Sequence, residues 1–155
     1  MMEFFTNDST QIMDFALKVG LATISGLLIG LEREFKGKEA GLKTNTLVAI
    51  GAAVFVLISL RFYGEAYTDV TRVLSQIVTG IGFLGAGVIL QKEKEERVKG
   101  LTTAATLWCS AGAGCLAAMG MWLELGILTF LVVIINIVFG YLDNKLRERN
   151  KTNWE

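Results

Sequence analysis

The sequence predicts an all-α membrane protein with five transmembrane helices. The chain has 155 residues, of which 52% are hydrophobic and 19% are charged. Its charged residues gather in short segments, and five apolar stretches lie between them, each with roughly the 17 to 25 residues that cross a bilayer as a helix. Fifteen Lys and Arg balance fifteen Asp and Glu, so we expect a lipid bilayer around the chain and no nucleic-acid partner.

The first span, residues 12–31, carries Asp14 and Lys18 near its start. These side chains are four residues apart, so they share one helical face and can pair or extend toward lipid headgroups. The first eleven residues contain no Lys or Arg, and a glutamate follows the apolar run where a cleavage site would need small residues. We therefore expect a retained helix and not a cleaved signal peptide.

Four more spans follow at residues 44–62, 73–90, 101–121 and 122–142. Thr44 or Thr46 can cap the second helix and Thr102 the fourth, because hydroxyl side chains accept hydrogen bonds from free N–H groups at helix starts. Residues 1–142 therefore form one five-helix transmembrane domain. Residues 143–155 are a short polar tail, too small to fold alone.

Basic residues predict the orientation of the spans. With five crossings, the N-terminus, the second link and the turn near Met121 share one side of the membrane, and the other links and the tail share the opposite side. Three basic residues fall on the first side and twelve on the second. The positive-inside rule makes the second side cytoplasmic and leaves the N-terminus outside. The twelve are Arg33, Lys36, Lys38, Lys43, Lys92, Lys94, Arg97, Lys99, Lys145, Arg147, Arg149 and Lys151.

The composition argues against an enzyme and against common metal centres. The chain has no histidine and two cysteines, Cys109 and Cys115, which are too few ligands for a zinc or haem site and exclude any Ser-His or Cys-His pair. No nucleophile with an activating base is visible. We expect both cysteines to pack as small apolar residues.

Glycines predict close helix packing. The third span contains Gly80, Gly82 and Gly85 in the order of a dinucleotide-binding fingerprint, but they lie within an apolar run and no strand precedes them. In lipid, glycines instead let neighbouring helices approach closely. Gly26 and Gly30 form a similar GxxxG pair in the first span. Such faces also permit a homodimer.

Polar residues within the spans leave two interpretations open. Gln76 and Thr79 share one face of the third helix, and Thr102, Thr106 and Cys109 share one face of the fourth. We single out Gln76 because its amide side chain lies well inside a span. These residues either form interhelical hydrogen bonds, worth about 0.6 kcal/mol each, or line a path for a small solute or ion.

A candidate functional patch lies at the predicted cytoplasmic ends of the spans, formed by Glu32, Arg33, Lys43, Asn45 and Thr102. The topology places these residues at one membrane level, so they can meet a partner there. A pair between Glu32 or the nearby Glu34 and Lys43 would instead lock the first hairpin.

Asp69 is the candidate for a cation at the outer side. It lies three residues before Arg72 at the start of the third span, so it can equally favour the helix dipole. Mg²⁺ needs only one or two carboxylates and keeps several waters, so its sequence signature is weak. We expect no bound cofactor.

Four segments together resemble the membrane domain of the MgtC/SapB family. They are LLIGLERE (27–34), AGLKTNTLVAIGAAVF (40–55), QIVTGIGFLGAGVIL (76–90) and VKGLTTAATLWCSAGAG (98–114), which cover about four of the five spans. The resemblance implies a bacterial inner-membrane protein associated with magnesium limitation, acid or envelope stress, and in some members virulence. It implies action through membrane protein partners, with Mg²⁺ as an ion that is sensed or transported.

Two departures from the family pattern stand out. Members commonly have Asn where this chain has Thr102, and many add a soluble C-terminal domain, so we expect a short form. Our first hypothesis is a non-enzymatic protein that supports magnesium or stress homeostasis through membrane partners. The alternative is a magnesium or other cation transporter or channel, which would accept the ion at Asp69 and Gln76 and release it near Glu32.

Overall fold

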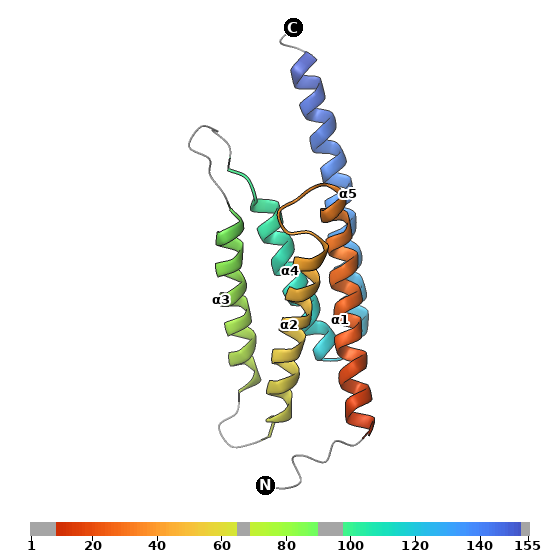
Figure 1. Cartoon of the computed structure of the whole chain (residues 1–155), viewed down its shortest axis with the longest axis vertical. Coiled ribbons are helices and arrows are strands. Elements are labelled where there is room, and N and C mark those ends of the chain that lie inside the picture. Colours follow the sequence, from red (N-terminus) through yellow and green to blue (C-terminus); the bar gives the residue numbers. More distant parts are fainter. Residues whose placement is uncertain (1–8, 65–68, 90–97, 153–155) are drawn as a thin grey trace.

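The structure is an antiparallel bundle of five helices that alternate in direction (Figure 1). The helices of this computed structural model are α1 (Ser9–Phe35), α2 (Leu42–Arg61), α3 (Val70–Val88), α4 (Leu101–Ala118) and α5 (Trp122–Thr152). The structure describes residues 9–64, 69–89 and 98–152, with side chains as far as residue 142. All five helices are long and apolar enough to cross a membrane. The predicted all-α class with five membrane-spanning helices is confirmed.

The helix ends differ from the predicted span ends by one to four residues at most positions and by more at the end of α5. α4 stops at Ala118, and Gly120 takes a positive φ of 73° in the turn before α5. α5 continues ten residues beyond the predicted end at Leu142, so its last turns project past the rest of the bundle (Figure 1). The third span was predicted to end at Leu90, which lies outside the described residues.

The predicted orientation in the membrane stays a prediction. Arg33, Lys36, Lys38 and Lys43 lie around the α1–α2 connection, at the same end of the bundle as the start of α4. We call this the basic end. Three other residues counted for the orientation, Lys92, Lys94 and Arg97, lie outside the described residues, as do the side chains of the four basic residues in the tail.

α1, α2 and α4 form the tightly packed centre of the bundle. A Cβ atom added to Gly26 would lie 2.7 Å from the Cα of Thr46, and one added to Gly30 would lie 2.7 Å from the Cα of Leu42. A Cβ on Gly114 of α4 would overlap the carbonyl of Ala49 on α2. These glycines let backbones touch, which is how helices gain packing energy in lipid.

α3 departs from this pattern. Gly85 packs against α4: a Cβ atom added to it would lie 3.4 Å from the Cβ of Ala104. An added Cβ on Gly80, Gly82 or Gly87 would meet no atom within 4 Å. Within one chain, Gly85 is therefore the α3 glycine that packs closely against a neighbouring helix among the described residues.

The helix caps also differ from the predicted ones. Gly41 and Gly100 occupy the N-cap positions of α2 and α4, so no threonine caps either helix. The Thr46 and Thr106 hydroxyls instead donate to carbonyls one turn earlier in their own helices, at 2.8 Å. The Cα of Gly100 has a φ of 92°, which favours glycine at this start.

Candidate functional site

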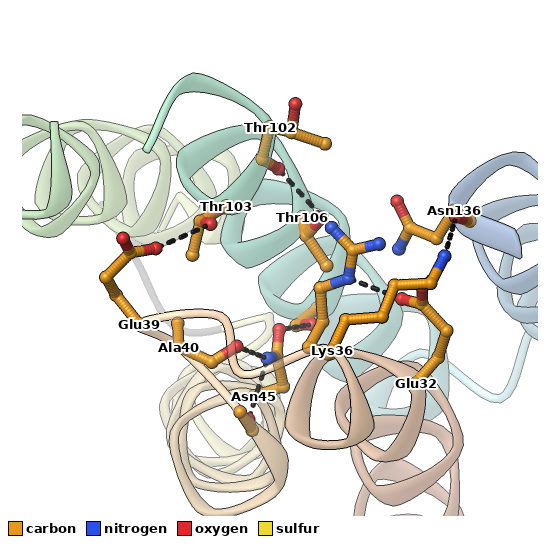
Figure 2. A network of polar contacts seen from close by, with 12 residues as sticks. Glu32, Lys36, Glu39, Ala40, Asn45, Thr102, Thr103, Thr106 and Asn136 are labelled. Carbon is orange, nitrogen blue, oxygen red and sulfur yellow. Dashed lines mark hydrogen bonds and ion pairs between the residues drawn. The ribbon is translucent and has the colours of Figure 1, made fainter. Parts of the chain in front are cut away.

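A buried charged cluster joins α1 to α5 at the basic end (Figure 2). The Glu32 carboxylate accepts a hydrogen bond from Arg33 Nε at 2.5 Å and pairs with Lys36 Nζ at 2.6 Å. Arg33 is 2% exposed and Glu32 is 9% exposed. Lys36 also donates to the backbone carbonyl of Asn136 on α5 at 2.9 Å, and Gly140 leaves room for its side chain.

The predicted pair between Glu32 or Glu34 and Lys43 does not form. Glu32 instead pairs with Arg33, its neighbour on α1, and with Lys36, which lies just beyond the end of α1. Glu34 accepts the backbone N–H of Leu42 at 2.9 Å, so it satisfies a free donor at the start of α2. Lys43 is exposed and lies along a groove between α2 and α3. The hairpin is thus held by a carboxylate at a helix start.

Asn45 is the centre of a second polar contact, where the α1–α2 connection meets α4 (Figure 2). Its fully buried amide donates to the carbonyls of Ala40 at 2.9 Å and Gly41 at 2.8 Å. Its Oδ1 accepts the hydroxyl of Ser110 on α4 at 2.8 Å. Both amide hydrogens and the amide oxygen therefore have partners, as buried polar groups require.

α4 turns a different threonine face inward from the one grouped with Cys109. Thr103, Thr106 and Ser110 are buried, and Thr103 donates to Glu39 Oε2 at 3.3 Å. Thr102 is exposed and Cys109 is half-buried. Among the predicted patch residues, Glu32, Arg33 and Asn45 are therefore internal, whereas Lys43 and Thr102 remain on the surface.

The intramembrane polar residues do not meet in one lining. Gln76 is exposed and lies in the α2–α3 groove, which has a volume of about 860 Å³ and is lined by these two helices alone. Thr79 is exposed and donates to the Ser75 carbonyl at 2.9 Å. Thr106 is buried in α4 and bonds within its own helix.

Asp69 lies at the end of the bundle opposite Glu32. It is exposed and forms the N-cap of α3, accepting the hydroxyl of Thr71 at 2.6 Å and its N–H at 2.9 Å. These hydrogen bonds from Thr71, the hydroxyl first, hold the pKa of Asp69 below its ordinary value. Within the described ranges, no three His, Cys, Asp or Glu side chains gather closely enough to hold a metal ion.

Four polar residues of the α1–α5 contact were missed by sequence reasoning. Lys36 and Asn136 belong to the charged cluster, and the Ser25 and Thr129 hydroxyls lie 2.6 Å apart further along the same two helices. Asn136 was a detectable signal, because it is an amide in an aliphatic span, so Gln76 is not alone in that respect. Asn136 is 6% exposed, and its Nδ2 has no hydrogen-bond partner among the described residues.

Known proteins share the segments that build this end of the bundle. The model of the MgtC family matches residues 19–145. The chain is 49% identical over 115 residues to Protein MgtC of Brucella suis, which covers 74% of this chain and 47% of that protein. It is 45% identical over 134 residues to Protein MgtC of Salmonella typhimurium, covering 86% of this chain and 56% of that protein.

A third relative is an uncharacterized protein of Synechocystis, 46% identical over 127 residues, which are 82% of this chain and 53% of that protein. The chain spans about half the length of the curated relatives it matches. No solved structure matches it. The family model covers both hairpins and most of α5, including every residue of the two polar contacts at the basic end. The chain is a multi-pass membrane protein that belongs to the MgtC family.

Proposed function

We propose that this chain is a non-enzymatic protein of the bacterial inner membrane that supports magnesium homeostasis or stress and virulence adaptation by binding other membrane proteins. Its basic end faces the cytoplasm in this proposal, as the positive-inside rule predicts. The five helices that are long and apolar enough to cross a membrane support the choice of a membrane, and membership of the MgtC family supports the choice of process.

One observation favours a binding protein over a carrier: the Glu32 carboxylate lies between Arg33 and Lys36. A carboxylate that already faces two cations offers no net negative charge to Mg²⁺, which prefers one or two free carboxylates and water. The cluster carries one more positive than negative charge. A cation leaving the membrane at this end would therefore meet repulsion.

The surface that partners would touch consists of the exposed members of the patch. Lys43 begins the exposed side of α2, and Thr102 stands in the first turn of α4. Among the internal residues, Asn45 links α2 to α4 through Ser110, whereas Glu32 and Arg33 pair with each other on α1. Partner binding is therefore tested at the exposed residues, and the internal ones report on folding.

The test is copurification of membrane proteins with Lys43→Gln and Thr102→Ala variants, after brief crosslinking in cells grown with limiting magnesium. Arg61→Gln is the matched control, because Arg61 is also exposed but lies at the opposite end of the bundle. We expect the patch variants to lose part of the partner set while expression stays normal. An unchanged set for both variants would contradict the proposal.

A second candidate, a magnesium or other cation carrier, is favoured by Gln76 in the α2–α3 groove. Magnesium flux into sealed proteoliposomes tests it, with Gln76→Leu and empty vesicles as controls. Saturable flux that Gln76→Leu abolishes would support the carrier. Arg72 and Lys43, which line the groove, argue against a cation path there.

A further inference from the structure

The outward faces of α3 and α5 differ in chemistry, although both helices lie at the periphery of the bundle (Figure 1). α5 exposes large apolar side chains: Leu123, Ile127, Phe130, Leu131, Ile135 and Phe139. α3 exposes the apolar Val78, Phe83 and Leu84, but also Ser75, Gln76, Thr79, Gly80, Gly82 and Gly87. The α5 face suits lipid chains, whereas the α3 face also carries polar side chains, Gln76 among them, and glycines.

Gln76 makes the α3 face costly to leave in lipid. It lies six residues after Val70, or about 9 Å along the helix axis, so its amide is within the apolar depth of the span. An amide without a partner in an apolar medium costs several kcal/mol. The amide becomes stabilising when a polar group from another helix forms a hydrogen bond with it.

The groove beside Gln76 offers space for another helix. Its walls carry Gly51 on α2 and Gly80 on α3, and a Cβ added to either would meet no atom within 4 Å. The surrounding walls are largely apolar, with Val48, Phe55 and Ile77 among them. An approaching helix could therefore come close to both backbones and cover the Gln76 amide.

We propose that a second copy of this chain fills the groove with its own α3, so that the two α3 helices lie side by side and each enters the α2–α3 groove of the other. Both copies cross the membrane in the same direction, so a twofold axis must run along the membrane normal. Identical residues then meet at the same depth. The inference goes beyond the proposed function and does not depend on it.

Self-complementary chemistry favours a second copy over an unrelated helix. An amide carries both donors and an acceptor, so Gln76 can pair with Gln76 of the other copy. Arg72 lines the groove, and Asp69 lies three residues before it and carries the opposite charge. The symmetry that brings the two Gln76 side chains together places Arg72 of each copy near Asp69 of the other. The contact is centred in the half of α3 away from Lys43.

The test uses Val73→Cys, which places a thiol on the α3 wall of the groove and keeps Gln76, in a chain whose native thiols are removed by Cys109→Ser and Cys115→Ser, oxidised in native membranes before detergent is added. We expect a disulfide-linked dimer at twice the mass of the 16.9 kDa chain. The matched control is Ile127→Cys in the same background, which places a thiol on the exposed face of α5 near the same end of the bundle. It is expected to give no dimer.

Gly80→Leu separates docking from folding. A Cβ added at this position meets open space within one chain, so thermal unfolding of the monomer should be unchanged, while the Val73→Cys dimer should be lost. Equal crosslinking of the Ile127→Cys control, no dimer from folded Val73→Cys, or crosslinks of Val73→Cys to a different protein would each overturn the proposal. Because crosslinking needs neither partners nor magnesium flux, a negative result here leaves the proposed function to its own test.

Discussion

Replacing Asn45 with alanine should destabilise the bundle more than any other single change at the basic end that leaves the charges intact. The substitution removes three hydrogen bonds, two to the α1–α2 connection and one from Ser110 on α4. At about 1 kcal/mol of net stability for each hydrogen bond, the free energy of unfolding should fall by about 3 kcal/mol. Ser110→Ala removes one of the three, so it should cost about 1 kcal/mol.

The assay is unfolding in mixed detergent and SDS micelles, followed by the fluorescence of the three tryptophans. A double-mutant cycle with Asn45→Ala and Ser110→Ala isolates the bond between α2 and α4, for which we expect a coupling of about 1 kcal/mol. Thr79→Ala is the matched control, because the Thr79 hydroxyl is exposed and bonds within its own helix. If Asn45→Ala costs no more than Thr79→Ala, the view of Asn45 as the link between the connection and α4 is wrong.

Three further predictions follow from the same contacts. Glu32→Ala leaves Arg33 and Lys36 without their carboxylate partner. Because breaking a buried ion pair costs about 3–5 kcal/mol, the yield of folded protein should drop sharply. A normal yield after purification would contradict a stabilising role for Glu32. Gly30→Ala should lower the free energy of unfolding by about 1–3 kcal/mol, because the added Cβ would overlap the α2 backbone. Gly80→Ala should leave it unchanged, since an added Cβ there meets no atom within 4 Å. Equal melting temperatures of the two variants would refute this difference. The carboxyl of Asp69 should titrate below its ordinary pKa of about 3.9, because the Thr71 hydrogen bonds favour the charged form. The cap therefore stabilises α3 at neutral pH and is lost as pH falls through that lowered pKa. Carbon NMR of the Asp69 carboxyl would follow this titration, and Thr71→Val should raise the pKa of Asp69.

Much of the fold was available from the sequence, because hydropathy depends on local composition. A run of about twenty apolar residues has few alternatives to a membrane-spanning helix, since every backbone polar group must find a partner within lipid. This constraint gave the five helices and their alternation. The close packing at Gly26 and Gly30 could also be predicted from the sequence, because small residues four positions apart lie on one face of a helix.

Side-chain pairing was not available in the same way. The patch residues lie at one end of the bundle, but Glu32 pairs with Arg33 and Lys36, and Lys43 is exposed. The depth of a residue in the membrane follows from topology alone. Which side chains pair with each other depends on the rotation of each helix about its axis. That rotation is set by contacts between distant segments, such as Lys36 with the carbonyl of Asn136, one hundred residues apart.

A five-helix membrane protein of the MgtC family could be recognised from the order of the residues alone, because span length and long matching segments are properties of the chain in order. Which polar groups find partners within one copy depends on how the helices pack. Asn45 finds all its partners in the α1–α2 connection and on α4, while Gln76 faces a groove. The difference arises because α4 packs against the centre of the bundle along its length, whereas α3 contacts its neighbours along one side.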